Sequence, residues 1–232
     1  MLDPYVLPST AILKNRFNLK TQQDLDDAEA DFASQRLREL ARDPIEGDYG
    51  VLHYLSFHRY IFQDLYDWAG EPRKMNIVKE EPALGGLSVE YTDYPDIRKR
   101  LAEVLGTMRR RPWEKYDLDK LTSHFSHDLA ALWKIHAFRE GNTRTTIHFR
   151  CQFADEHGFP IDRQLFEENS HYVRTALVAY NAVFSDIGDK SQKQYLSSVT
   201  SVSLITCYSS FLTMMTSSFW NSIINPFFRK RV

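Results

Sequence analysis

The stretch KIHAFREGNTRTT, residues 134–146, carries the strongest structural signal in this chain of 232 residues. An apolar helical pattern over 127–135 leads into His136, and a second helical pattern begins near Asn142. Gly141 permits a sharp turn and leaves neighbouring backbone N–H groups uncovered, and asparagine is a favoured N-cap residue. The stretch therefore predicts two apolar helices joined by a short polar loop.

The groups of this loop match the needs of phosphoryl transfer. The unpaired N–H groups and the positive dipole end of the second helix form a ready anion site. Arg144 can add a bidentate contact to phosphate, and Glu140 is the kind of carboxylate that holds Mg²⁺ together with a polyphosphate. His136 titrates near neutral pH and can act as a base. A single histidine is usually structural, so it is the combination that indicates phosphoryl-transfer chemistry.

Apolar periodicity predicts a mostly helical domain around this loop. A helical segment before residue 45 is followed by a strongly apolar helix over 49–68, for which Gly70 is a suitable C-cap. The next segment differs, because proline and glycine divide it into two short strand-like pieces, 74–78 and 88–91, which predict a hairpin. Further helices are expected at about 95–110, 116–135, 143–157 and 165–185.

Composition excludes several classes of protein. The formal net charge is −2, with 43 % hydrophobic and 26 % charged residues, which is typical of a globular chain and unlike a disordered one. The near-neutral balance argues against a nucleic-acid-binding protein, which usually carries a basic stripe. Two cysteines, Cys151 and Cys207, are too few for a disulfide framework or a cysteine-based zinc site. With no signal-peptide pattern either, we expect a cytoplasmic protein.

A change in charge divides the chain. The stretch 194–228 has no charged residue, every Asp and Glu precedes it, and the basic triplet 229–231 follows it. We therefore expect a folded domain over 1–197 and a Ser/Thr-rich apolar tail over 198–232. Hydroxyl residues interrupt the tail, so it has no continuous apolar run of membrane-spanning length. A segment that packs on the domain or on a partner, or an extension with little structure of its own, is a simpler interpretation than a membrane anchor.

The loop resembles the motif of the Fic (filamentation induced by cAMP) domain proteins, His-Pro-Phe-x-Asp/Glu-Gly-Asn-Gly-Arg-x-x-Arg. Residues 136–147 of this chain are HAFREGNTRTTI. The resemblance extends to the N-terminal residues 3–5 and 13–15, and to YDWAG at 66–70. Together it covers about residues 1–197.

The resemblance implies a Fic-type helical bundle with a β-hairpin flap near 73–91. It also implies a bacterial protein adenylyltransferase that moves AMP from ATP to a hydroxyl side chain of a target protein. His136 would be the catalytic base, Glu140 would hold Mg²⁺, and Phe138 would anchor the loop in the core. The residues that the resemblance assigns to nucleotide binding are Asn76, Ile77, Glu140, Gly141, Asn142, Thr143, Arg144 and Tyr180.

The resemblance also implies how partners bind. A target peptide would pair with the strand edge of the flap by β-augmentation. The family's inhibitory pattern, Ser/Thr-x-x-x-Glu-Gly/Asn, is not found at either end of the sequence. Inhibition would then come from a separate small antitoxin-like protein, or such control would be missing. Fic proteins of pathogenic bacteria act as toxins in their own cell or as effectors secreted into a host cell, and the sequence leaves both open.

Three residues depart from the motif and keep other functions open. Ala137 replaces proline and loosens the loop, Thr143 replaces the second glycine, and Ile147 replaces the final arginine, which removes one positive charge. The alternatives are a Fic-fold enzyme that transfers phosphate or another nucleotide, and a binding protein that has lost catalysis. A metal hydrolase with a zinc site made of three histidines is a further alternative. Those ligands would be His124, His127 and His136.

Overall fold

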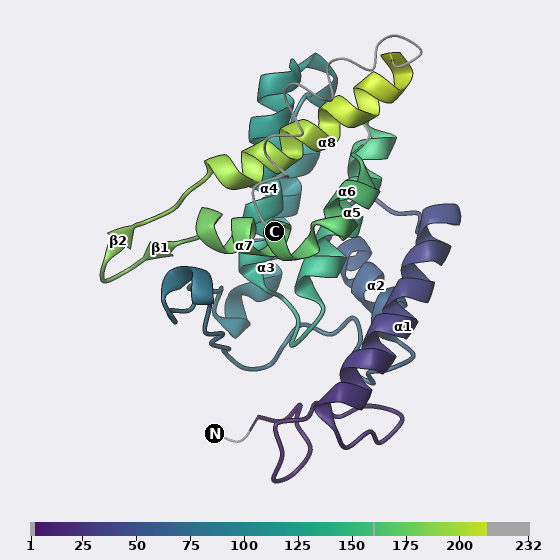
Figure 1. Ribbon diagram of the computed structural model, residues 1–232, viewed down its shortest axis with the longest axis vertical. Coiled ribbons are helices and arrows are strands. Elements are labelled where there is room, and N and C mark those ends of the chain that lie inside the picture. The colour runs from purple at the N-terminus through teal and green to yellow at the C-terminus, as the bar shows by residue number, and fades with distance from the viewer. Residues whose placement is uncertain (1–2, 160, 213–232) are drawn as a thin grey trace, which may run out of the picture.

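A computed structural model of the chain describes residues 3–159 and 161–212 (Figure 1). Helices carry most of this part of the chain, so the expectation of a mostly helical fold is confirmed. The α-helices are α1 (Gln22–Arg42), α2 (Val51–Phe62), α3 (Ile97–Arg110), α4 (Leu118–Ile135), α5 (Asn142–Glu156), α6 (Arg163–Glu168), α7 (Ser170–Tyr180) and α8 (Gln194–Leu212). The short 3-10 helices are η1 (Pro82–Leu84), η2 (Tyr94–Asp96) and η3 (Trp113–Lys115).

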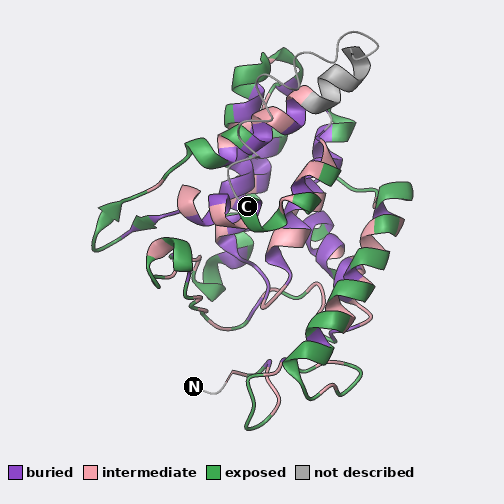
Figure 2. Cartoon of the chain, in the orientation of Figure 1, coloured by how far each residue is buried: buried purple, intermediate pink, exposed green. Residues whose placement is uncertain are grey.

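Helix α4 is the central element of the fold, because it contacts α3, α5, α7 and α8. Asp117 caps its first turn by accepting a hydrogen bond of 2.9 Å from the backbone N–H of Lys120. Apolar residues at helical spacing, among them Leu129 and Trp133, are fully buried and fill the core, each stabilising the fold by roughly 2 kcal/mol. Much of this helix is buried (Figure 2). It therefore ends inside the protein, and the following residue, His136, is buried in the interior.

Helices α1 and α2 pack against each other, and α2 packs on α5. Helix α1 buries Leu25, Ala33 and Leu40. Arg36 of α1 donates two hydrogen bonds, of 2.6 and 2.9 Å, to the carboxylate of Asp64, just beyond α2. This ion pair ties α1 to the end of α2, so α1 has a fixed position from which its side chains reach the loop after α4.

Two helices are shorter than the periodicity predicts. Helix α2 ends at Phe62 and not near residue 68, because turns lead from there to Gly70, whose φ of +83° suits glycine. The helix expected over 165–185 is divided into α6 and α7 at Asn169, whose side-chain amide donates to the carbonyl oxygen of Leu165 at 2.9 Å. Apolar spacing alone does not reveal such breaks, because the apolar face continues across them.

A small antiparallel hairpin is present, but the structure places it at β1 (Val183–Phe184) and β2 (Gly188–Asp189) and not at 73–91. The expected location of the hairpin is therefore wrong. Residues 73–92, called the flap below, form a loop that folds back around η1. A side chain there takes a backbone group that a strand ladder would need, since the N–H of Lys79 donates to the hydroxyl oxygen of Ser88 at 3.1 Å.

Arg73 closes the base of the flap. Its guanidinium donates to the carbonyl oxygens of Met75, at 2.6 Å, and of Thr92. Its Nε donates to the carbonyl oxygen of His136 at 2.8 Å, and its backbone N–H donates to that of Ala137 at 2.8 Å. Arg73 is 2 % exposed, and burial lowers its pKa. One buried residue thus connects both ends of the flap to the loop that follows α4.

Helix α8 continues without a break across residue 197, the predicted boundary between domain and tail. It packs against α4, α6 and α7 and buries Leu196. A hydrogen bond of 3.0 Å between the hydroxyl groups of Ser126 and Thr200 joins it to α4 in the core. The start of the tail is therefore part of the helical bundle, and 213–232 lie outside the described residues. No helix in the described part of the chain is long and apolar enough to cross a membrane.

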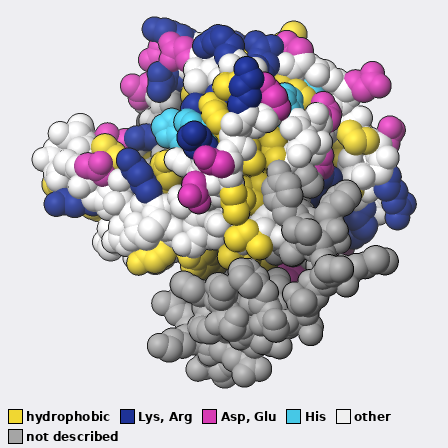
Figure 3. Space-filling view, turned by 90° about the horizontal axis from the view of Figure 1, so that it is seen from above, with side chains coloured by type: hydrophobic (Ala, Val, Ile, Leu, Met, Phe, Trp, Pro, Cys, Tyr) yellow, Lys and Arg dark blue, Asp and Glu magenta, His cyan; other side chains and the backbone are white. Residues whose placement is uncertain are grey.

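One face of the molecule shows how charge is distributed on the surface (Figure 3). Lysine and arginine side chains lie among aspartate and glutamate side chains over this face, and apolar side chains form a narrow strip between them. Because the two signs are interspersed among the described residues of this face, these residues create no extended field of one sign.

Candidate active site

His136 adopts a left-handed backbone conformation, with φ of 49° and ψ of 56°, directly after α4. This conformation is uncommon for residues other than glycine and persists only where surrounding contacts hold it. The N–H of His136 donates to the carbonyl oxygen of Trp133 at 3.0 Å, and its own carbonyl oxygen accepts from Arg73. These contacts fix the histidine at the sharp turn between the helix and the loop.

His136 is 3 % exposed, and its ring contacts Tyr91 and Trp133 at centroid distances of 4.0 and 5.4 Å. Neither ring nitrogen has a hydrogen-bond partner in the described part of the chain. Burial lowers the pKa of the imidazole well below its ordinary value, and the nearby cations Lys79 and Arg73 lower it further. The ring is therefore neutral at physiological pH, and its free nitrogen can accept a proton.

Asn142 closes the loop between α4 and α5. Its side-chain oxygen accepts from the N–H of Phe138 at 2.9 Å, and its side-chain nitrogen donates to the carbonyl oxygen of Phe138 at 2.8 Å. Gly141 has a φ of +77° and occupies the cap position expected for Asn142, which is the first residue of α5. The backbone N–H groups of 142–144 have no hydrogen-bond partner among the described residues, as is usual for the first turn of a helix. Such groups are the kind that can bind an anion.

His58 of α2 holds this loop in place and was not identified from the sequence. Its Nδ1 accepts from the N–H of Gly70 at 2.8 Å, so Nε2 carries the proton and donates to the carbonyl oxygen of Glu140 at 3.0 Å. Its ring stacks on Phe138 at a centroid distance of 3.7 Å, and Phe138 is fully buried, as an anchor requires. Burial lowers the pKa of His58 to about 3. The only signal in the sequence was a histidine in an apolar helix, which is common in protein cores.

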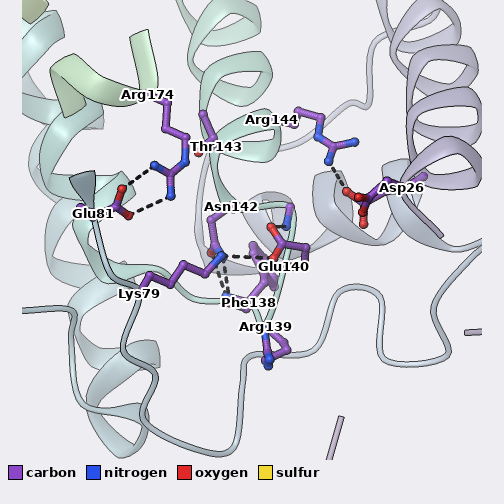
Figure 4. Close-up of polar contacts among 12 residues, drawn as sticks. Asp26, Lys79, Glu81, Phe138, Arg139, Glu140, Asn142, Thr143, Arg144 and Arg174 are labelled. Atoms are coloured by element: carbon purple, nitrogen blue, oxygen red, sulfur yellow. Dashed lines mark hydrogen bonds and ion pairs between the residues drawn. The ribbon is translucent and has the colours of Figure 1, made fainter. Parts of the chain in front are cut away.

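The carboxylate of Glu140 has two different partners. Oε1 accepts from the backbone N–H of Gly141 at 3.1 Å, and Oε2 forms an ion pair with Nζ of Lys79 in the flap, also at 3.1 Å (Figure 4). Burial acts to raise the pKa of this carboxyl, but Lys79 and the Gly141 N–H outweigh burial, and the pKa is lowered overall. Glu140 is therefore ionised at neutral pH and binds the ammonium group of Lys79.

Arg144, in the first turn of α5, extends toward α1 (Figure 4). There it pairs with Glu29. Glu29 also accepts a hydrogen bond of 2.5 Å from the hydroxyl group of Tyr66. The hydroxyl oxygen of Thr143 accepts from Nε1 of Trp133 at 2.9 Å. The side chain that replaces the second glycine of the motif is thus held against α4.

The remaining predicted site residues lie outside the loop. Asn76 and Ile77 line a groove of about 410 Å³ along the flap, where the side-chain amide of Asn76 donates to Asp93 at 2.7 Å. Tyr180, at the end of α7, lines a second cavity of about 210 Å³ beside the end of α4. Within the described part of the chain Tyr180 makes no hydrogen bond to the loop. The structure thus brings together the predicted residues of 136–144 and places the other three elsewhere.

A second ion pair fastens the flap to α7. Arg174 donates hydrogen bonds of 2.7 and 2.8 Å to the two carboxylate oxygens of Glu81, whose side chain is 3 % exposed (Figure 4). Tyr91, also in the flap, packs on the ring of His136. Sequence reasoning missed these residues and Lys79, because they are distant from the motif along the chain and belong to no local pattern.

Comparisons with known proteins agree with this geometry. The model of the Fic/DOC family matches residues 50–154. The probable protein adenylyltransferase y4lH of Sinorhizobium fredii is 33 % identical over 171 residues, which cover 71 % of this chain and 82 % of that relative. The chain belongs to the Fic/DOC family. Protein adenylyltransferase VbhT of Bartonella schoenbuchensis is 32 % identical to this Fic/DOC chain over 160 residues, which cover 69 % of the chain and 32 % of VbhT. The match thus spans about a third of the length of VbhT.

Solved structures share the fold of this Fic/DOC chain. BepC, a VirB-translocated effector protein of Bartonella tribocorum with bound AMPPNP, is 17 % identical with a TM-score of 0.70, covering 86 % of this chain and 95 % of BepC. The N-terminal Fic domain of Bep8 from Bartonella sp. 1-1C is 18 % identical with a TM-score of 0.68, covering 84 % and 92 %. At these identities the likeness shows the fold, and the expected Fic-type helical bundle is confirmed.

The zinc alternative gains no support from the geometry. The ring of His124 stacks on Tyr116 at a centroid distance of 4.7 Å, whereas His136 lies beyond the far end of α4. Over residues 3–159 and 161–212, no group of three or more His, Cys, Asp or Glu residues is arranged to hold a metal ion.

Proposed function

We propose that this Fic/DOC chain is a protein adenylyltransferase, which moves AMP from ATP to the hydroxyl group of a serine, threonine or tyrosine in a target protein. The observation that carries the proposal is the neutral, unpartnered imidazole of His136 in the same loop as a free helix N-terminus and an ionised Glu140. Relatives named as protein adenylyltransferases, and a structural neighbour with bound AMPPNP, support the same activity.

The proposed reaction is an in-line displacement. The free ring nitrogen of His136 takes the proton of the target hydroxyl while the hydroxyl oxygen bonds to the α-phosphorus of ATP. The bond between the α-phosphorus and the bridging oxygen breaks, and pyrophosphate leaves with that oxygen. The backbone N–H groups of 142–144 stabilise the negative charge of the phosphates, and the two hydrogen bonds of Asn142 keep these groups in place.

Glu140 is the residue that would hold Mg²⁺ in this reaction. One oxygen already binds the ammonium group of Lys79, the other is fixed by the N–H of Gly141, and the side chain is 34 % exposed. Magnesium usually binds one or two protein carboxylates and completes its coordination with phosphate and water, so a single accessible carboxylate fits. When bound, the ion would neutralise part of the charge on the phosphates.

The groove along the flap supports docking of the target. The backbone N–H groups of Ile77 and Val78 have no hydrogen-bond partner in the described part of the chain, and Val78 is 80 % exposed. An extended peptide can pair with such groups as an added strand, even though the flap itself is not a hairpin. The groove of about 410 Å³ gives room for the side chains of that peptide.

Control and location are part of the same proposal. Residues 1–232 do not contain the family's inhibitory pattern, and we propose that a separate small protein inhibits the enzyme, with the absence of such control as the alternative. We place the activity in the cytoplasm of its own cell, and the translocated Bartonella effectors among the structural neighbours support delivery into a host cell as the alternative. Labelling a lysate of each kind of cell separates the two, since only one of them contains the natural target.

The experiment that tests the function uses purified protein, Mg²⁺, a cell lysate, and ATP labelled at either the α- or the γ-phosphate. A variant without the His136 imidazole is the control. Label that enters protein from the α-position only, and is lost in the variant, is the result expected for AMP transfer. Label from the γ-position only would replace the proposal with phosphate transfer. Label from neither position, by a protein that still binds ATP, would favour a binding protein without catalysis.

A further inference from the structure

We infer that Lys79 is a further nucleotide-binding residue, whose ammonium group leaves the carboxylate of Glu140 and binds the phosphates of ATP when Mg²⁺ enters with the nucleotide. This inference rests on the proposed function. It adds one side chain of the flap to a site that is otherwise built from the loop between α4 and α5.

Lys79 is placed at the reacting centre by a single contact. Its Nζ lies 3.1 Å from Oε2 of Glu140 and has no other hydrogen-bond or ion-pair partner in the described part of the chain (Figure 4). The side chains are 24 % and 34 % exposed, so the pair is partly shielded from water. Lysine carries a compact charge on a flexible four-carbon stem, so this ammonium group can follow another anion a few ångströms away without movement of the flap backbone.

The other cations around the loop are engaged elsewhere. Arg174 is bound by both oxygens of Glu81, and Arg144 is paired with Glu29. Neither Glu81 nor Glu29 belongs to the loop. A metal ion bound to Glu140 in the loop therefore leaves the Arg174–Glu81 and Arg144–Glu29 pairs intact. Lys79 differs because its partner is the carboxylate that Mg²⁺ requires.

Charge decides the direction of the exchange. A divalent ion that also binds a triphosphate attracts a carboxylate more strongly than an ammonium group does. The ammonium group of Lys79 is then released within a few ångströms of the phosphates that the same ion contacts. Leaving it unpaired in a partly shielded site is unfavourable, and phosphate oxygens are the nearest anions that can replace Glu140.

Ile147 explains why the chain needs this additional cation. The family's motif has an arginine at that position, whereas Ile147 is apolar and 7 % exposed. The site therefore lacks one positive charge for the outer phosphates. Lys79 supplies a positive charge to the same phosphates from the flap.

The experiment compares two lysines of the flap in the full chain. Lys79→Met removes the ammonium group and keeps most of the side-chain length. Lys74→Met is the matched control, because Lys74 is 72 % exposed and pairs with Glu71. Isothermal titration measures the affinity for Mg²⁺–AMPPNP, which is not consumed, and competition measures the affinity for adenosine, which has no phosphate.

Lys79→Met should weaken the binding of Mg²⁺–AMPPNP about tenfold or more, as expected for loss of a charged hydrogen bond, and change adenosine binding less than twofold. Lys74→Met should change neither, and Lys79→Arg should keep most of the affinity. Unchanged AMPPNP binding in Lys79→Met would overturn the inference and leave the function standing. Equal weakening for AMPPNP and adenosine would also overturn it, because that result describes a distorted flap. Failure of the unmodified chain to bind Mg²⁺–AMPPNP would overturn the proposed function as well.

Discussion

The loop after α4 and the flap that covers it are held in place by different means. In the loop, backbone geometry and buried contacts fix each position, as the positive φ of Gly141 and the paired hydrogen bonds of Asn142 show. In the flap, charged side chains make the connections, with Lys79 bound to the loop and Glu81 bound to α7. The loop cannot rearrange without disturbing the core, whereas the flap can move when ion pairs change partners. A rigid loop suits the placing of a base, and a movable flap suits the admission of substrates.

The largest expected effect is the loss of catalysis when His136 is replaced. That loss would show that the chemistry depends on the loop. Asparagine tolerates the left-handed conformation of His136 but cannot accept a proton as imidazole does. His136→Asn should therefore lower the rate of AMP transfer by about 10²–10⁴-fold, with a melting temperature close to that of the unmodified chain. Initial rates with α-labelled ATP, together with a thermal melt, measure both. A variant that keeps more than a tenth of the rate would remove His136 from the role of base.

Substitution of two glycines with positive φ, one in the loop and one in the flap, compares the rigidity of these two regions directly. Gly141 has a φ of +77°, and a Cβ atom there would lie 2.3 Å from the ring of Phe62. Gly85 of the flap has a φ of +64° and no atom within 4 Å of such a Cβ. Gly141→Ala should lower the free energy of unfolding by about 2–4 kcal/mol, and Gly85→Ala by about 1 kcal/mol. Urea denaturation measures both, and equal losses would show that the loop is no more constrained than the flap.

The buried histidine under the loop should make stability depend on pH. The folded pKa of His58 is about 3, and its value in the unfolded chain is about 6.5. Between these values the unfolded chain binds a proton that the folded chain does not, so stability falls as the pH falls. His58 contributes about 1.4 kcal/mol to the fall in the free energy of unfolding for each pH unit in this range. Urea denaturation at pH 7, 6 and 5 should show a shallower decline for His58→Gln than for the unmodified chain. If the free energy of unfolding fell equally steeply with pH in both proteins, His58 would not be a source of the pH dependence.

The smallest expected effect concerns the flap alone. Arg174→Met leaves the buried carboxylate of Glu81 without its partner, and because Arg174 itself is 40 % exposed we expect a local loss of about 1 kcal/mol. Amide hydrogen exchange in 79–91 should then become about fivefold to tenfold faster, while exchange in 142–156 stays unchanged. Equal acceleration in both segments would mean that loop and flap open as one unit.

The loop could be predicted from the sequence because local residues determine it. Gly141 and Asn142 act within a few positions of their own place in the chain, so the pattern alone indicates a tight turn and a helix start. The contacts that complete the site come from distant segments. His58, Glu29 and Lys79 are brought to the loop only by the packing of α1, α2 and the flap. No spacing along the chain reports that packing.

The hairpin is a case in which a local sequence pattern predicts the wrong location. Alternation over 74–78 and 88–91 resembles strands, but Ser88 and the buried guanidinium of Arg73 take backbone groups that a ladder would use. The actual strands, 183–184 and 188–189, continue an apolar helical pattern. The turn over 185–187 joins them and ends just before Gly188, whose φ is +81°. That glycine was the available signal, and strands of two residues are too short for periodicity to detect.

Arg73 restricts the backbone at 136–137 through hydrogen bonds, whereas a proline at 137 would restrict it through its covalent ring. A proline at position 137 would restrict the backbone before folding as well as after it, and so would lower the entropy lost when the loop orders. With Ala137 in its place, the carbonyl oxygens of 136 and 137 are held by the side chain and backbone of Arg73. The entropic cost of order grows with temperature, whereas the enthalpy of these bonds does not grow with it. His136 is thus positioned by hydrogen bonds, and we expect its alignment to weaken at a lower temperature than it would in a loop with proline at 137.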